Sequence, residues 1–199
     1  MSFEASETVT QEFFEYLVKS HSLGHNGFHG KDHWLRVLQN AREIAGETRA
    51  NLRVLELFAV LHDSRRENEN HDPEHGQRAA AYAITLRGKW FDLADDEMDL
   101  LIEACRFHSD GLTEAHPTIQ ACWDADRLDL GRVGIRPNAG YLCTAYAKRI
   151  DVISRSYIRS LGGGGETSGQ SIECLAFKKV KVGGFSAVWK RIFDREGLR

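Results

Sequence analysis

The sequence predicts an all-α protein, a helical bundle organised around one buried helix. Three observations lead to this expectation. Apolar residues recur at spacings of three and four in most segments before residue 160, as they do on the buried face of a helix. Glycine-containing or strongly polar stretches separate these segments. Residues 52–63 are apolar almost throughout, which is typical of a helix that other helices surround.

The expected helices follow from this periodicity and from residues that begin helices. Pro73 directly after Asp72 indicates a helix start with Asp72 as the N-cap. Asp95 or Asp96 is expected to cap the next helix, and Thr118 the one after that. The predicted helices cover residues 6–21, 31–50, 52–63, 72–88, 95–108, 118–126 and 138–160.

The length and composition favour one domain. The chain has 199 residues and a hydrophobic share of 42%, enough for one sizeable core and too little for two. We assign residues 1–160 to the helical domain and residues 161–199 to a C-terminal extension of unassigned role that packs on it. Alternation and β-branched residues in 172–182 predict a short β-hairpin, and residues 185–193 are compatible with an extra helix.

The charge of the chain argues against several classes of partner. It carries 26 Lys and Arg against 29 Asp and Glu, a net charge of −3, which gives no electrostatic footprint for nucleic acid or an anionic membrane. No run of about eighteen apolar residues occurs, and the first residues lack the basic and apolar regions of a signal peptide. We therefore expect a cytoplasmic monomer or homodimer whose partner is a small molecule.

The cysteines carry no signature of redox or zinc chemistry. They are far apart in the sequence, lie in apolar neighbourhoods and show no paired C-x-x-C spacing. We expect all of them to be reduced and buried: Cys105, Cys122, Cys143 and Cys174.

Four residues form the strongest candidate metal site. His62 and Asp63 come directly at the end of the buried helix, His33 lies near the start of the preceding one, and Asp126 lies near the end of a later one. Imidazole and carboxylate groups suit Mn²⁺, Fe²⁺, Co²⁺, Ni²⁺ or Zn²⁺, and Mg²⁺ is a further candidate. Neighbouring helix residues point about 100° apart, so His62 and Asp63 share one ion only near a helix end or with the ion between them.

The order of these residues resembles the signature of the HD superfamily of metal-dependent phosphohydrolases. That signature is a histidine, a later His-Asp pair and a final aspartate on an all-helical scaffold, which match His33, His62, Asp63 and Asp126. The resemblance covers residues 25–150 and implies that these four side chains bind the metal.

The resemblance extends to residues 102–109 and 124–135, which are similar to a bacterial subgroup of small HD hydrolases. Members of this subgroup act on nucleotides or related phosphate compounds. The likeness implies that His108 lies close to the metal.

His75 and His108 are candidates for a second metal ion or for catalysis. Two other branches of the superfamily, the cyclic-dinucleotide phosphodiesterases and the di-iron oxygenases, hold a second metal with histidines between the His-Asp pair and the last aspartate. His75 and His108 lie in that interval and could instead donate or accept protons. Because His75 comes early and no doubled histidine occurs at His108, we predict one ion in preference to two.

Several polar residues beside these motifs are candidates for substrate binding. His29 and Lys31 precede His33, and Arg65 and Arg66 follow the His-Asp pair directly. A phosphate would meet the two arginines at the rim of the pocket. Solvated loop charge is the alternative interpretation of this pair.

The remaining polar residues near the site have supporting roles in this interpretation. Asp124 and Asp129 are expected to cap helices or to orient Arg127 and a ligand histidine. Arg36 and Arg127 are expected to form structural ion pairs. The other histidines are interpreted as loop or helix-end residues: His21, His25, His71 and His116.

The activity that this pattern predicts is metal-assisted hydrolysis of a phosphoester or phosphoanhydride, in a nucleotide or small phosphate ester. Asp63 is the candidate to orient the nucleophile. One alternative is a non-catalytic binding or regulatory module, in which the metal would only stabilise the structure. An HD-fold di-iron oxygenase is the other alternative, because it needs six protein ligands and the chain offers His33, His62, Asp63, His75, His108 and Asp126.

Overall fold

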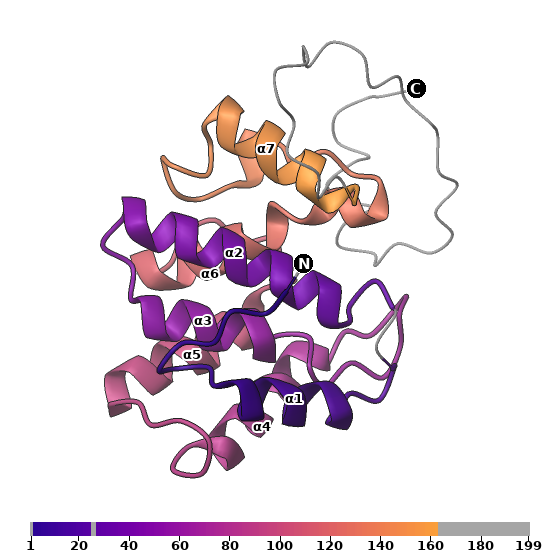
Figure 1. Ribbon diagram of the computed structural model, residues 1–199. Coiled ribbons are helices and arrows are strands. Elements are labelled where there is room, and N and C mark those ends of the chain that lie inside the picture. The colour runs from indigo at the N-terminus through magenta and orange to yellow at the C-terminus, as the bar shows by residue number, and fades with distance from the viewer. Residues whose placement is uncertain (1, 25–26, 163–199) are drawn as a thin grey trace.

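The computed structural model describes residues 2–24 and 27–162, and the expected all-α fold is confirmed there (Figure 1). Within these ranges the only bridge of β type joins Arg87 and Phe91. None of the described helices is long and apolar enough to cross a membrane. The hairpin or helix predicted for residues 172–193 lies outside the described ranges. The helices are α1 (Gln11–Ser20), α2 (Lys31–Glu47), α3 (Leu52–Leu61), α4 (His75–Leu86), α5 (Asp95–Phe107), α6 (Pro117–Arg127), η1 (Leu130–Val133), η2 (Ala139–Tyr141) and α7 (Ile150–Ser160).

Helix α3 lies in the middle of the bundle, as its apolar sequence predicts. Figure 1 shows it between α1 and α2, and α5 and α6 also pack against it. Every residue from Val54 to Leu61 is buried. Glu56 is charged within this stretch, and its carboxylate accepts hydrogen bonds from Arg42 Nε at 2.8 Å and Ser6 Oγ at 2.7 Å. These bonds compensate for the loss of hydration on burial.

The N-termini of α1 and α3 are set by side chains that accept backbone hydrogen bonds. Thr10 Oγ1 accepts from the Phe13 N–H at 3.2 Å, so α1 begins at Gln11 rather than near residue 6. Asn51 Oδ1 accepts from the N–H groups of Arg53 and Val54 at 3.0 and 3.4 Å. Each bond satisfies a donor that the helix itself leaves unpaired.

The predicted caps at Asp72 and Thr118 are wrong because other groups bind both side chains. The Asp72 carboxylate pairs with Arg78 at 2.6 Å and accepts from the Glu67 N–H at 2.8 Å, and α4 begins only at His75. Thr118 Oγ1 accepts from the N–H of Asn51, which precedes α3, while His116 caps α6 with its ring nitrogen.

The cap of α5 lies one residue earlier than predicted. Ala94 is the N-cap, and Asp95 and Asp96 are already helical. The Glu97 carboxylate reaches back to accept from the Ala94 N–H at 3.0 Å. Glu97 therefore satisfies the N–H of the N-cap residue itself, whereas a capping aspartate would have accepted from an N–H of the first helical turn.

The long helix predicted over residues 138–160 is broken. Its first part is only the short η2, and α7 begins at Ile150. The buried carboxylate of Asp124 accepts from the N–H groups of Cys143 and Thr144, both at 2.7 Å. These two donors are then unavailable for helical bonds, so the chain stays irregular up to α7.

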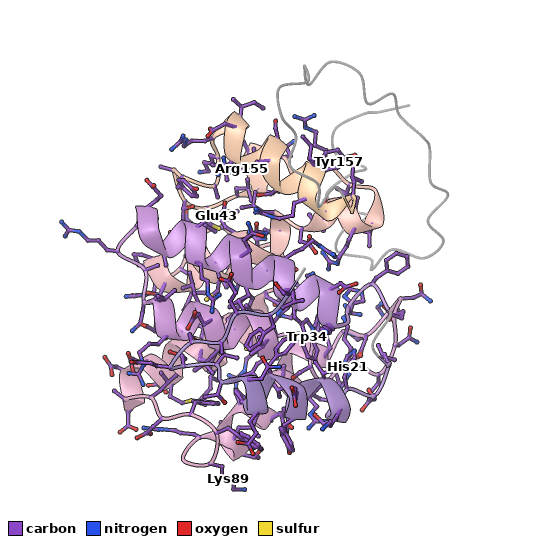
Figure 2. The ribbon with its side chains drawn as sticks, in the orientation of Figure 1. His21, Trp34, Glu43, Lys89, Arg155 and Tyr157 are labelled. Carbon is purple, nitrogen blue, oxygen red and sulfur yellow. The ribbon has the colours of Figure 1, made fainter. Side chains whose placement is uncertain are left out.

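Helix α7 lies along α2 and is held there by ion pairs (Figures 1 and 2). Arg155 Nη2 lies 3.3 Å from Glu43 Oε2, and Arg159 Nη1 lies 2.8 Å from Glu43 Oε1. On the other side of α2, His21 packs edge-on against Trp34 with ring centroids 5.1 Å apart. Helix α2, which carries His33, is therefore fixed on both sides.

The cysteines of the described residues are free, as expected. Cys105 and Cys122 are buried, and burial raises the pKa of both thiols. Cys143 is only half-buried, and burial raises the pKa of its thiol to about 12. Cys174 lies outside the described ranges.

Candidate metal centre

Six side chains from five helices meet in the interior of the bundle. Helix α3 ends at Leu61, and His62 and Asp63 follow where the chain turns, so neighbouring residues can face one site. His62 and Asp63 therefore lie at a helix end, which is where two neighbouring residues can share one ion. All six side chains are buried: His33 on α2, His62 and Asp63 after α3, His75 at the start of α4, His108 after α5 and Asp126 on α6.

The first triad consists of His33, His62 and Asp126. The two Nε2 atoms lie 3.1 Å apart. Asp126 Oδ1 lies 3.4 Å from His33 Nε2 and 3.7 Å from His62 Nε2. Atoms that bind one transition metal at about 2.1 Å are separated by roughly 3.0 to 3.4 Å, so this spacing suits a shared cation.

The second triad consists of His75, His108 and Asp63. The two Nε2 atoms lie 2.9 Å apart, and Asp63 Oδ1 lies 3.4 Å from His75 Nε2 and 3.6 Å from His108 Nε2. Asp63 Oδ2 faces the first triad instead, 3.5 Å from His33 Nε2 and 3.6 Å from His62 Nε2. The carboxylate of Asp63 therefore belongs to the second triad through Oδ1 and faces the first triad through Oδ2, so it links the two.

The imidazoles present unprotonated Nε2 atoms to the centre because their Nδ1 atoms are bonded on the other side. A carbonyl oxygen only accepts, so an Nδ1 that bonds to it carries the proton and leaves a lone pair on Nε2. Two Nε2 lone pairs about 3 Å apart repel each other, and a cation between them removes that repulsion. Three Nδ1 atoms contact carbonyl oxygens: His62 to Phe58 at 3.1 Å, His75 to Asp72, and His108 to Cys105 at 2.7 Å.

His33 is oriented by a carboxylate rather than a carbonyl. Its Nδ1 donates to Asp129 Oδ2 at 2.7 Å, and Arg36 Nε donates to Asp129 Oδ1 at 2.6 Å. The expected bond of Asp129 to a candidate ligand histidine is present, and so is the expected ion pair of Arg36. Such a carboxylate fixes the tautomer of a metal-binding histidine and raises its basicity.

The flanking residues Asp124 and Arg127 have other roles than predicted. Asp124 bonds the backbone of residues 143 and 144, as described above. Arg127 donates to the carbonyl oxygens of Tyr141 and Leu112 at 2.9 and 2.6 Å instead of forming the expected ion pair. Both residues hold the segment after α6 in place.

The pKa of His108 is raised by its hydrogen bond to Asp63 and by the nearby carboxylates, but burial keeps His62 and His75 neutral. It lowers the pKa of His62 to about 3 and that of His75 to about 4. Burial alone would raise the pKa of the Asp63 carboxyl, but His29, His62 and Arg66 hold it well below its usual range. Neutral imidazole and ionised carboxylate are the forms that bind metal ions.

Asp126 gives a separate indication that a cation fits. Its Oδ1 is buried and has no hydrogen-bond partner among the described residues. A buried carboxylate oxygen without a partner is costly, and a metal ion would satisfy it. The donor set and this oxygen together fit a divalent cation.

Two of the predicted substrate-binding residues contact the centre. His29 Nδ1 lies 2.8 Å from Asp63 Oδ2, and its Nε2 lies 3.8 Å from Glu69 Oε2. Arg66 is buried and its Nε donates to Asp63 Oδ1 at 3.0 Å. Arg66 therefore fixes the carboxylate between the triads.

The other two predicted residues are not brought to the six side chains by any contact in the described residues. The Arg65 guanidinium lies over the Tyr82 ring, 3.4 Å from its centroid, and donates to the Ser20 carbonyl at 3.3 Å. Arg65 thus joins α4 to α1. Lys31 is exposed at the first residue of α2.

Arg132 is a residue of the centre that sequence reasoning missed. It lies on η1, and its Nη2 is 3.7 Å from Asp126 Oδ1. Its Nη1 donates to the Asp129 carbonyl at 3.2 Å. The spacing of three residues from Asp129 was the available signal, since a helical turn brings such residues together.

No protein-family model, curated protein or solved structure matches this chain. Its function is therefore inferred from the residues of the centre. Buried clusters of His and Asp can hold a divalent metal ion here, as the first triad and its neighbours indicate. A divalent cation in such a site can promote hydrolysis, react with oxygen or stabilise the fold. The residues around the centre indicate which of these roles fits.

Proposed function

We propose that this protein is a metal-dependent phosphohydrolase of the HD superfamily that cleaves a phosphoester or phosphoanhydride. The observation that carries the proposal is the position of Asp63 between two His-Asp triads, with one carboxylate oxygen toward each. The arrangement agrees with the sequence motif that suggested the family, and each motif residue lies within 4 Å of another.

A cation held by the first triad would lower the pKa of a water molecule toward neutrality and polarise a phosphoryl oxygen. The chain's own residues supply the rest of the chemistry. Asp63 is the group that orients the nucleophile, because its two oxygens are fixed by Arg66 and His29. His29 Nδ1 is hydrogen-bonded to Asp63 Oδ2, so the proton that the attacking water releases can be taken up by the Asp63–His29 pair and returned by His29 to the leaving oxygen.

We infer that the second triad binds a second ion. The sequence favoured a single ion, but the 2.9 Å separation of His75 Nε2 and His108 Nε2 matches two ligands of one cation. Their anchored Nδ1 atoms leave a lone pair on each Nε2 that faces the same space as Asp63 Oδ1, where one cation would bind all three atoms. Under this proposal the two histidines are ligands, and proton transfer belongs to His29.

The di-iron oxygenase is kept as the second candidate because six His and Asp side chains surround the centre, the number that activity needs. Arg132, which lies beside the Asp126 carboxylate without a short bond to it, favours an anionic substrate and hence the hydrolase. A non-catalytic module would give neither phosphate release nor oxygen consumption.

The test begins with elemental analysis of the purified protein. The metal-free protein is then reloaded with Mn²⁺, Fe²⁺, Co²⁺, Ni²⁺, Zn²⁺ or Mg²⁺ and screened with nucleotides and small phosphate esters for phosphate release. We expect metal-dependent hydrolysis that is lost in Asp63→Asn and kept in His71→Gln, a change at an exposed histidine outside the centre. Oxygen consumption by the iron-loaded protein without phosphate release would establish the oxygenase instead.

A further inference from the structure

Arg132 lies at the edge of the metal centre with one nitrogen that makes no hydrogen bond within the described residues. Its Nε donates to the Phe28 carbonyl at 3.0 Å, and its Nη1 donates to the Asp129 carbonyl at 3.2 Å. Its Nη2 lies 3.7 Å from Asp126 Oδ1, which is too long for a hydrogen bond. Two nitrogens therefore hold the guanidinium in place, and the third points to the first triad.

The exposure of the side chains shows from which side the centre is reached. Exposure is lowest at the imidazoles of the two triads and rises toward Asp126, His29 and Glu69. The exposed fractions are 0% for His33 and His62, 3% for His75, 4% for His108, 10% for Asp126, 12% for His29 and 30% for Glu69. Phe28, whose carbonyl holds Arg132, is itself exposed. The Arg132 side chain is 8% exposed and lies between Asp126 and the exposed Phe28, on this more open side of the centre.

An arginine beside a cation site needs a reason, because two positive groups repel each other. For Arg36 and Arg66 the reason is a short bond to a carboxylate, at 2.6 Å to Asp129 and 3.0 Å to Asp63. Arg132 has no comparably short bond to a carboxylate. Its partners are the two carbonyl oxygens, which position the group without neutralising it.

The charge of the centre calls for an anion once a cation is bound. Four carboxylates face three guanidinium groups, so the protein alone contributes one excess negative charge. Each divalent cation adds two positive charges and makes the centre positive, which attracts an anion. The four carboxylates and three arginines are Asp63, Glu69, Asp126, Asp129, Arg36, Arg66 and Arg132.

We propose that Arg132 is a substrate-binding residue whose Nη2 donates a hydrogen bond to a nonbridging phosphoryl oxygen beside Asp126. The inference rests on the proposed phosphohydrolase function and deepens it. The substrate class is a phosphate ester or anhydride that keeps a charged nonbridging oxygen on the reacting phosphorus. Because two of its nitrogens are already bonded, Arg132 loses little conformational freedom on binding.

The test measures binding of inorganic phosphate to the Mn²⁺-loaded protein by calorimetry, with the metal content of each variant determined beside it. Arg132→Gln is expected to weaken phosphate binding by about 10- to 100-fold, the size of a lost charge-assisted hydrogen bond, with the metal content unchanged. Arg136→Gln is the matched control. Arg136 is exposed, lies four residues further on and bonds Ser154 Oγ, so this change removes the same charge outside the centre.

Two further variants separate substrate binding from support of Asp129. Arg36→Gln removes the short bond to Asp129 from the other side and is expected to weaken Mn²⁺ binding, while phosphate binding at saturating Mn²⁺ stays at the wild-type level. If Arg132→Gln fails to fold, Arg132→Lys keeps the charge and is expected to weaken phosphate binding by about 3- to 10-fold.

Equal phosphate affinity in wild type and Arg132→Gln would overturn the assignment. The same loss of phosphate binding in Arg36→Gln at saturating Mn²⁺ would also overturn it, since Arg132 would then act through Asp129. A wild-type protein that binds Mn²⁺ but neither binds phosphate nor hydrolyses any phosphate ester would overturn the proposed function and this inference together.

Discussion

Replacing Asp129 by asparagine should convert His33 from a metal ligand into a hydrogen-bond donor. Arg36 donates to both carboxylate oxygens of Asp129, from Nε to Oδ1 at 2.6 Å and from Nη2 to Oδ2 at 3.2 Å, so the shorter bond favours the amide oxygen of the new side chain at the Oδ1 position. The amide nitrogen then takes the place of Oδ2, 2.7 Å from His33 Nδ1. A donor at this position forces Nδ1 to accept, and the ring proton moves to Nε2, which faces the metal site.

The expected loss of metal affinity follows from the number of metal-binding side chains that the substitution affects. Residues that orient a ligand histidine contribute about 10- to 100-fold to metal affinity, which corresponds to about 1.4–2.8 kcal/mol. Calorimetric titration of the metal-free protein with Mn²⁺ or Co²⁺ measures this loss. His62, Asp126 and Asp63 remain in place, so weakened binding rather than abolished binding is expected.

Asp124→Asn is the matched control for this experiment. Asp124 is as buried as Asp129, but it bonds the backbone N–H groups of Cys143 and Thr144 and no histidine. Its replacement is expected to lower the free energy of unfolding by about 1–3 kcal/mol and to leave metal affinity unchanged. Equal losses of metal affinity in the two variants, or none in Asp129→Asn, would refute the tautomer argument.

Three further predictions concern stability. Leu57→Ala, at a fully buried position of α3, should lower the free energy of unfolding in urea by about 2–5 kcal/mol, and a near-zero effect would contradict the described core. Asn51→Ala should lower it by about 1 kcal/mol or more, because it removes both the α3 cap and the Asn51 Nδ2 bond to Glu97, while Asn51→Ser, which keeps a capping oxygen and puts no second carboxylate beside Glu97, should retain most of the cap. Burial lowers the pKa of His62 to about 3 and of His75 to about 4 from 6.5, so below pH 6.5 the unfolded chain binds protons that the folded protein excludes. The unfolding free energy of the metal-free protein should therefore fall between pH 6.5 and 4, by up to about 1.4 kcal/mol per pH unit for each histidine. Asp63 raises the pKa of His108, so the contribution of His108 to stability is lost as the pH rises and not as it falls. A flat profile between pH 6.5 and 4 would show that the rings of His62 and His75 are not neutral.

Much of the fold could be predicted because helical periodicity is a local property. The apolar run before His62 predicted the central helix, and α3 is buried from Val54 to Leu61. Helix starts were less predictable where a capping side chain had another partner that competes for it. Asp72 has a capping side chain, but Arg78 and the Glu67 N–H bind it instead.

The candidate site was also predictable only in part. Residue type and order were enough to select His33, His62, Asp63 and Asp126, and the structure brings all four together. The roles of charged neighbours were not predictable, because Arg65 and Arg66 are adjacent in sequence yet face different partners. Arg66 bonds Asp63, whereas Arg65 lies over Tyr82.

The sequence by itself determined that the chain forms helices with one buried face and which imidazoles and carboxylates are available to a cation. These properties depend on residue type and on spacing within a few turns. The tertiary structure alone decided that the ligands form two triads around Asp63, that Asp129 orients His33 across 96 positions of sequence, and that Arg132 faces the open side. The physical reason is that metal and hydrogen-bond geometry depends on distances of a few ångströms between distant segments, which only the packing of helices sets.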